Sequence, residues 1–302
     1  MAIKKLDDLF DVLRSQPKKR LVAAYANDSH TIGAIAKAVE LGIVEATLVG
    51  DEATMKKVCS DLGVKAEQFK LVHEPVDVKA VDKAVQLIND GQGDVLMKGL
   101  VTTDKYMRGI LNKEHGLLPP KAVLSHVTVV QVPSYHKLLI VGDVAIIPAP
   151  DFKQKVAITN YVIRTAHSLG IERPKVALLA ATEQMSVGMS ACVDAALIAK
   201  MGERGQIGGA VLDGPLALDV AIDREAADIK KLKGEVAGDA DCVVFPNIES
   251  GNVFFKTCTK FAGAELGAMV VGAKVPCILT SRGDSVQSKL YSIALAANAA
   301  RR

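Results

Sequence analysis

The chain contains no tryptophan, and aromatic side chains make up only 4% of its 302 residues. Hydrophobic residues nevertheless account for 49%, so alanine, valine, leucine and isoleucine must build most of the core. Small aliphatic side chains suit closely packed layers of helix on sheet. The length is enough to bury a sizeable core, and it suggests two domains, although one large α/β unit also fits.

Cysteines are few and isolated in the sequence. No C-x-x-C pair occurs, so zinc-ribbon and dithiol redox motifs find no support. The odd number of cysteines and their wide spacing favour reduced thiols, and we therefore expect a cytoplasmic protein. The five are Cys59, Cys192, Cys242, Cys258 and Cys277.

Long apolar runs are also missing. The charged N-terminus, with Lys4, Lys5 and Asp7, lacks the apolar region of a signal peptide. The longest hydrophobic stretch, residues 262–279, contains Glu265 and Lys274. We therefore expect no membrane span and no membrane partner.

Charge of either sign is dispersed. The formal net charge is +3, and the basic clusters are short, as at Lys18, Lys19 and Arg20. No aromatic residues interleave with them to stack on bases, so we expect no nucleic-acid partner. A mild positive balance is compatible with a pocket for anionic small molecules.

Common cofactor and catalytic motifs are absent as well. The sequence has no G-x-G-x-x-G after its first predicted strand, no H-E-x-x-H and no G-x-S-x-G. Residues 267–274 resemble a phosphate loop, but they carry an extra alanine before Lys274 and lie within predicted strand. The six histidines are scattered. We therefore expect no metal and no tightly bound cofactor.

What is present is a repeated alternation of short β-rich runs and amphipathic helical stretches. Such alternation predicts an α/β fold with a mostly parallel sheet covered by helices. Residues 127–132 and 138–147 form a predicted hairpin, residues 202–216 a predicted loop, and residues 252–261 and 285–300 predicted helices. Other strands are predicted at 21–25, 46–49, 70–72, 94–97, 175–179, 241–245 and 277–279.

Ligands of such sheets bind at the carboxyl ends of the strands. Four polar segments are predicted there: 27–29, 98–103, 245–251 and 280–285. In the last, Thr280-Ser281-Arg282-Gly283-Asp284-Ser285, a turn before a helix offers backbone N–H groups, and Arg282 offers a planar fork for phosphate. The same turn can equally be a helix cap with Arg282 in solvent.

The segment 98–108 has two readings of the same kind. Lys98, Thr102, Thr103 and Arg108 can bind a phosphate, and Gly99 can allow a ligand to approach the backbone closely. Alternatively, one threonine caps the next helix, and Arg108 lies on its solvated face.

Two further segments carry polar side chains beside turn signals. Residues 213–219, DGPLALD, place Asp213 and Asp219 around a Gly-Pro turn, which also fits a plain turn before a capped helix. Residues 246–252, PNIESGN, can line a cleft or cap the following helix. The candidate substrate-binding side chains of the two segments are Asp213, Asn247, Glu249 and Asn252.

Taken together, these segments resemble the phosphate acetyl/butyryltransferase family. The resemblance extends over most of the chain in family order, and the butyryltransferase branch is the more similar. The motifs that carry it are LMKGLVTTDKYMRGIL (96–111), LLAATEQMSVGMSACVDAALIAKM (178–201), DGPLALD (213–219), PNIESGNVFFK (246–256) and TSRGDS (280–285).

The resemblance implies a fold and an assembly. It implies two three-layer α/β domains with parallel or mixed sheets, similar to isocitrate and isopropylmalate dehydrogenases. The expected first domain is discontinuous, residues 1–143 plus 284–302, and residues 144–283 form an inserted second domain with the active-site cleft between the two. A homodimer or higher homo-oligomer is expected.

The resemblance also implies the reaction, acyl-CoA + phosphate ⇌ acyl phosphate + CoA, with coenzyme A as a substrate. Ser281 and Arg282 match the catalytic Ser-Arg pair of the family, and Arg108 matches an arginine of the substrate site. The acetyltransferase branch has a carboxylate, proposed as general base, where this chain has Ser288. The nearest carboxylate is Asp284, which becomes the candidate base.

Three alternatives remain at this stage. The same chemistry on acetyl groups differs only in pocket size. A metal- and NAD-dependent decarboxylating dehydrogenase shares the implied fold, and Asp213, Asp219 and Asp223 can imitate its carboxylate cluster. A non-catalytic protein that binds CoA or phosphate is the third.

Overall fold

The computed structural model describes residues 3–279 and 285–300, and its contacts divide the chain into two compact units. Residues 7–124 and 267–302 form one unit, named here the flanking unit. Residues 1–6 and 125–266 form the other, the central unit. Both names refer to position in the sequence.

The flanking unit contains a sheet of strand order β3-β2-β1-β4-β11-β10, in which β10 runs antiparallel to β11 and the others are parallel. The strands are β1 (Lys19–Ala24), β2 (Val44–Gly50), β3 (Lys70–His73), β4 (Val95–Lys98), β10 (Glu265–Val271) and β11 (Cys277–Ile278). The helices are α1 (Asp8–Arg14), α2 (Ser29–Glu40), α3 (Glu52–Asp61), α4 (Asp77–Asn89), α5 (Thr103–Ile110) and α11 (Val286–Ala299), with a 3-10 turn at Ala66–Gln68.

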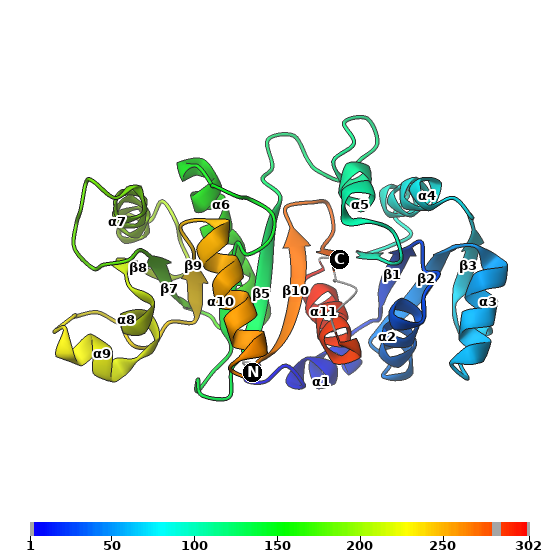
Figure 1. Ribbon diagram of the computed structural model, residues 1–302, viewed down its shortest axis with the longest axis horizontal. Helices are drawn as coiled ribbons and strands as arrows, with labels where there is room; N and C mark the ends of the chain where they lie inside the picture. The colour runs from blue at the N-terminus through cyan, green and yellow to red at the C-terminus, as the bar shows by residue number, and fades with distance from the viewer. Residues whose placement is uncertain (1–2, 280–284, 301–302) are drawn as a thin grey trace. The chain divides into compact units, whose positions relative to one another are not determined.

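Short polar residues start the helices that follow β1 and β2. The Asp28 carboxylate accepts a hydrogen bond from the Thr31 N–H at 2.8 Å, and Asp51 accepts one from the Thr54 N–H at 2.8 Å. Each satisfies a donor that the first helical turn leaves free. Helices α2, α3 and α11 cover one face of the sheet, and α4 and α5 cover the other (Figure 1).

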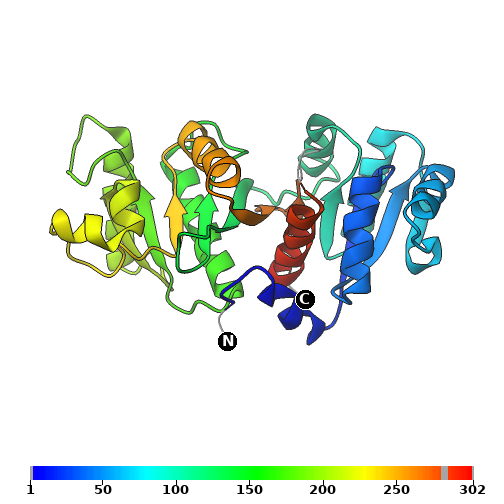
Figure 2. The ribbon, with the colours of Figure 1, turned by 60° about the horizontal axis from the view of Figure 1, so that its bottom comes forward.

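The central unit has the strand order β5-β6-β9-β7-β8, with β5 antiparallel to β6 and the others parallel. Helices lie on both faces of these strands (Figure 2). The strands are β5 (Ser125–Gln131), β6 (Leu139–Gly142), β7 (Lys175–Leu179), β8 (Val211–Leu216) and β9 (Cys242–Val244). The helices are α6 (Phe152–Ser168), α7 (Ser190–Glu203), α8 (Leu218–Ile222), α9 (Arg224–Ile229) and α10 (Ile248–Lys260).

The predicted α/β alternation and the hairpin are confirmed, since Val127 pairs with Gly142 in the antiparallel β5–β6 ladder. The predicted loop at 202–216 is wrong in its second half, where β8 pairs with β7. Pro215 has no N–H to donate, but β8 is an edge strand of this sheet, where such a residue is tolerated. Helix α10 begins at Ile248, earlier than predicted, because Asn247 caps it.

The bounds of the two units differ from the predicted domain ranges, in which one domain gave way to the other between residues 143 and 144 and between residues 283 and 284. Residues 125–143 belong to the central unit because β6 pairs with β9, as at Ile140 and Cys242. Residues 267–283 belong to the flanking unit, whose β11 pairs with β4. The first six residues join the central unit, where the Ile3 N–H donates to the Leu169 carbonyl at 2.8 Å.

A charge cluster closes the amino ends of β6, β7 and β9 in the central unit. The Asp239 carboxylate contacts His136 at 2.8 Å, Lys137 at 2.9 Å and the ammonium of Lys175. Desolvation raises the pKa of the Asp239 carboxyl, but the hydrogen bonds from Lys175, Lys137 and His136 outweigh it and lower that pKa below its ordinary value. The cluster therefore stabilises the fold only while Asp239 is ionised.

We expect Asp239→Asn to lower the free energy of unfolding by about 2–3 kcal/mol at pH 7, because charged hydrogen bonds are lost. The pKa of Asp239 is lower in the folded state, so its contribution is complete above the unfolded-state pKa of about 3.9. It is lost as the pH falls from there toward the folded-state pKa. Urea unfolding at pH 7 and pH 3 should show a difference from wild type that shrinks in acid. The exposed Asp228 provides the control, since Asp228→Asn should change little at either pH; an equal loss in both variants would contradict the assignment.

Candidate functional site

Strands β1 and β4 of the flanking unit end in two loops that bond to each other. The Gly99 N–H donates to the Ala24 carbonyl at 2.9 Å, and the Leu100 N–H donates to the Tyr25 carbonyl at 2.8 Å. Tyr25 has a left-handed φ of 59°. A Cβ on Gly99 would lie 2.3 Å from the Tyr25 carbonyl oxygen, so glycine is required for packing against this loop. The predicted reason was close approach of a ligand; the group that approaches is the protein's own backbone.

Lys98, the last residue of β4, is 5% exposed. Its ammonium donates to the carbonyls of Gly99 at 3.2 Å and Val101 at 3.0 Å. A buried cation bonded to carbonyls of its own loop holds the shape of that loop. Lys98 therefore supports the backbone from which the following polar residues project.

The next three predicted residues lie on α5. The Thr102 hydroxyl accepts from the Lys105 N–H at 3.5 Å, which makes Thr102 the N-cap, and Thr103 is the exposed first residue of the helix. Arg108 is exposed, with 79% of its side chain accessible, and pairs with Asp104 at 3.1 Å. Exposed ion pairs of this kind are weak, so Arg108 can exchange Asp104 for an anionic ligand at little cost.

The predicted catalytic residues Ser281, Arg282 and Asp284 lie outside the described residues. The chain on either side of them is described. Ile278 of β11 pairs with Met97 in register, directly before Lys98 on β4. Ser285 caps α11 by accepting from the Ser288 N–H at 3.0 Å, and the two serine hydroxyls lie 3.1 Å apart. Ser288, which occupies the position of the acetyl-branch carboxylate, is thus part of a helix cap.

In the central unit, the loops after β6 and β9 pack together at the carboxyl ends of these strands. The Asn252 amide donates to the Val144 carbonyl at 3.1 Å, and Asn247 caps α10 by accepting from the Ser250 N–H at 3.0 Å. A Cβ on Gly251 would lie 2.4 Å from the Asp143 carbonyl oxygen, so the start of α10 touches the backbone after β6. Glu249 is exposed in the first turn of this helix. Asn247, Glu249 and Asn252 are therefore gathered on one short stretch.

Asp143 supports this arrangement and was missed by the sequence analysis. It is 3% exposed, and its carboxylate accepts from the Ser125 hydroxyl and from the N–H groups of His126, Ala145 and Ile146 at 2.7–3.1 Å. Four donors compensate the buried charge. The available signal was a carboxylate directly after the apolar run that became β6.

Asp213 is placed differently from the other predicted residues. It lies inside β8, three residues before the strand ends at Leu216, which is about 10 Å at the rise of a strand. Burial raises the pKa of Asp213, Glu203 raises it further, and the Gly214 N–H donates to it at 2.8 Å. Asp213 therefore does not join the side chains at the carboxyl ends.

The other two carboxylates of the dehydrogenase alternative have separate partners. Asp219 contacts Lys230 at 3.4 Å, and Asp223 caps α9 by accepting from the Glu225 N–H at 2.9 Å. In residues 3–279 and 285–300, no three His, Cys, Asp or Glu side chains are grouped so as to hold a metal ion. Within the same residues, no helix is long and apolar enough to cross a membrane.

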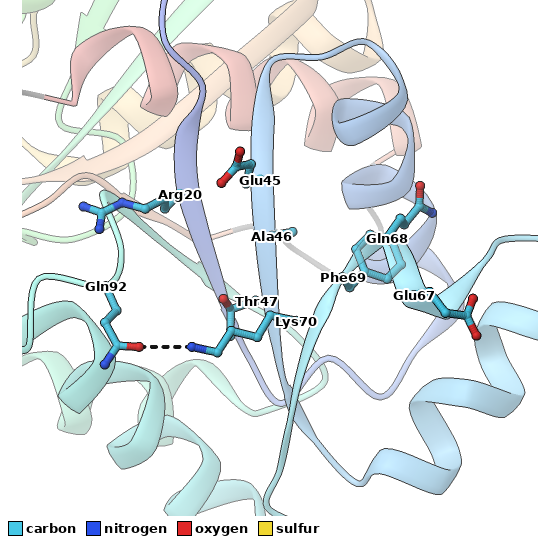
Figure 3. Close-up of a pocket in the computed structure, with 9 residues that line it drawn as sticks. All are labelled: Arg20, Glu45, Ala46, Thr47, Glu67, Gln68, Phe69, Lys70 and Gln92. Atoms are coloured by element: carbon cyan, nitrogen blue, oxygen red, sulfur yellow. Dashed lines mark hydrogen bonds between the residues drawn. The ribbon is translucent and has the colours of Figure 1, made fainter.

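A hollow of about 640 Å³ opens at the opposite, amino ends of β1, β2 and β3 (Figure 3). Arg20, Thr47 and Lys70 line it, and the dashed line in Figure 3 marks the hydrogen bond from the Lys70 ammonium to Gln92 at 3.1 Å. Arg20 is engaged by Asp94 at 2.7 Å. Within the flanking unit, the hollow therefore lies at the end of the strands opposite to Lys98.

All five cysteines are buried and reduced. Burial raises the pKa of Cys59 and Cys258 above the ordinary value, that of Cys242 far above it, and that of Cys277 to about 12. None of these four thiols is a thiolate at neutral pH, so none has the character of a nucleophile.

Comparison with known proteins agrees with the motifs. The family model described as phosphate acetyl/butaryl transferase matches residues 64–297. A phosphate butyryltransferase from Clostridium acetobutylicum is 43% identical over 295 residues, which cover 98% of each chain. The crystal structure of a branched-chain phosphotransacylase from Enterococcus faecalis superposes with a TM-score of 0.82 at 30% identity, covering 93% of this chain and 98% of that one.

A more distant match concerns the fold alone. The structure of 4-hydroxythreonine-4-phosphate dehydrogenase from Klebsiella pneumoniae has a TM-score of 0.58 at 13% identity, covering 94% of this chain and all of that one. The predicted dehydrogenase-like α/β fold is thereby confirmed, as is the resemblance that implied it. The chain belongs to the phosphate acetyl/butyryltransferase family.

Proposed function

We propose that the protein exchanges an acyl group between coenzyme A and inorganic phosphate, with butyryl as the preferred acyl group. The observation that carries the proposal is the family match over residues 64–297, a range that includes every candidate site residue. The 43% identity to a phosphate butyryltransferase supports the butyryl branch. The substrates are then acyl-CoA and phosphate in one direction and acyl phosphate and CoA in the other.

The proposed roles follow the chemistry of acyl transfer. Toward acyl-CoA, the base accepts the thiol proton, and the thiolate sulfur attacks the carbonyl carbon of the acyl phosphate. The C–S bond forms, the C–O bond to phosphate breaks, and phosphate leaves. Asp284 is the proposed base, Ser281 donates to the oxyanion, and Arg282 binds the leaving phosphate.

The substrate-binding role is proposed for Thr103, Arg108, Asn247, Glu249 and Asn252, which are exposed in the segments that follow β4 and β9. Lys98 and Thr102 contribute by holding the loop and the helix start that present them. Asp213, a partly buried residue inside β8, is retained as a substrate-binding candidate of the DGPLALD motif.

The buried cysteines, none of which is in a disulfide, support a cytoplasmic location for the enzyme. The family resemblance supports assembly as a homodimer or higher homo-oligomer, which light scattering on the purified protein would measure.

A thiol-release assay tests the proposal. Purified protein is mixed with phosphate and a panel of acyl-CoAs, and free CoA is followed with a thiol reagent. We expect release that requires phosphate and is fastest with butyryl-CoA. A preference for acetyl-CoA would assign the acetyl branch, whereas absence of phosphate-dependent release with every acyl-CoA would refute the function.

The assay has a built-in control. Because the five protein thiols are buried, the native enzyme without acyl-CoA should give no rapid signal, and unfolding it should release five thiols. A fast signal from the native enzyme would have to be subtracted before any rate is interpreted.

A further inference from the structure

A largely buried ion pair joins α6 to α7 in the central unit, and neither of its residues is among the candidate site residues. Lys155 lies in the first turn of α6 and is 7% exposed. Its ammonium donates to Oδ2 of Asp194 on α7 at 2.7 Å, and the two side chains are 9% and 22% accessible. The partners are 39 residues apart in the sequence.

The pair borders a small cavity at the carboxyl ends of β7 and β9. Leu178 and Val244 reach it from the strands, Ala195 reaches it from α7, and Pro246 reaches it from the loop after β9. The space open to a water molecule is about 10 Å³, enough for one. The walls of the cavity are therefore nearly in contact, and a movement of α6 or α7 would displace Pro246.

Stability alone does not account for charges at this place. Two ions lose hydration when they are buried, and replacing such a pair with apolar side chains of similar size is often neutral or stabilising. The surroundings are already aliphatic, so an apolar pair would suit them. Unlike an apolar contact, an ion pair fixes the distance and orientation of the two helices that carry it.

The loop that lines this cavity beside the ion pair begins the substrate segment. Asn247 follows Pro246 directly and caps α10, the helix that carries Glu249 and Asn252. We propose that Lys155 and Asp194 are positioning residues, whose ion pair sets α6 and α7 so that Pro246 and Asn247 take the geometry needed to bind substrate. The inference rests on the proposed function, since it assigns Asn247 to the substrate site.

The double variant Lys155→Met/Asp194→Leu tests the proposal, because it removes the charges and keeps an apolar contact. We expect a Tm within a few degrees of wild type together with a KM raised at least tenfold for phosphate or acyl-CoA, and a smaller change in kcat. Lys155→Met alone should lower the Tm as well, because it leaves the Asp194 charge buried without its cation. A double variant with wild-type KM values for both substrates, whatever its Tm, would overturn the inference.

The matched control is Lys137→Met, which removes an ion-paired lysine of the same unit at the amino ends of the strands. It should lower the Tm and leave both KM values unchanged. If the double variant fails to fold, Asp194→Asn replaces it, with at least a threefold rise in KM expected and an unchanged KM counting against the proposal. Wild-type enzyme without phosphate-dependent CoA release would refute the proposed function and this inference together, whereas active wild type with unaffected variants refutes the inference alone.

Discussion

Replacing Ser281 with alanine should lower kcat by two to three orders of magnitude, the loss typical when one donor to an oxyanion is removed, about 3–4 kcal/mol. Arg282→Ala should lower kcat/KM by at least as much, because its guanidinium both binds the phosphate and neutralises its charge as it leaves. The expectation rests on the match of TSRGDS to the family's Ser-Arg pair. It also agrees with the position of β11, the strand before this segment, which pairs with the end of β4.

Thiol release with saturating butyryl-CoA and varied phosphate separates the two effects. Ser281→Ala should act mainly on kcat, and Arg282→Ala should also raise the KM for phosphate. Arg173→Ala is the matched control, since Arg173 is an exposed arginine paired with Glu235 at 2.7 Å beside the amino end of β7. The role given to Ser281 and Arg282 would have to be withdrawn if both variants turned over at the wild-type rate.

The order of strands and helices was predictable because it depends on local patterns. Apolar runs of strand length, cap residues such as Asp28 and the hairpin signal around residues 133–136 all act within a few residues. Helix α10 shows the limit of this reasoning: Asn247 was recognised as a possible cap, yet the helix was predicted to begin later. The unit bounds could not be predicted in the same way, because they depend on pairings such as β6 with β9, about 100 residues apart.

The same distinction between local patterns and long-range contacts applies to the candidate site. The rule that ligands meet the carboxyl ends of strands directed attention to 98–103 and 245–251, and the structure places these segments at the ends of β4 and β9. What each side chain does there depends on its three-dimensional neighbours: Lys98 bonds to its own loop, and Asp213 lies inside a strand. No local sequence pattern predicts the Lys155–Asp194 pair, because its two charges belong to separate helices.

Gly99→Ala should be among the most damaging single methyl additions in the flanking unit. The new Cβ would lie 2.3 Å from the Tyr25 carbonyl oxygen and 2.9 Å from that of Ala24, and both are backbone atoms that cannot rotate away. We expect a loss of about 3 kcal/mol in the free energy of unfolding, typical of severe overpacking. The loop must also move away from β1, so the bonds from Gly99 and Leu100 that position the start of α5 should weaken.

The control is Gly33→Ala in the middle of α2, where the nearest atom to a new Cβ is 4.0 Å away. It removes backbone freedom from the unfolded chain without a clash, so it should stabilise the protein by about 0.5–1 kcal/mol. Urea unfolding of both variants measures the contrast. If Gly99→Ala were as stable as wild type, the close packing of the β1 and β4 loops would be refuted. If it folded stably but lost activity, Gly99 would instead be serving the ligand, as the sequence first suggested.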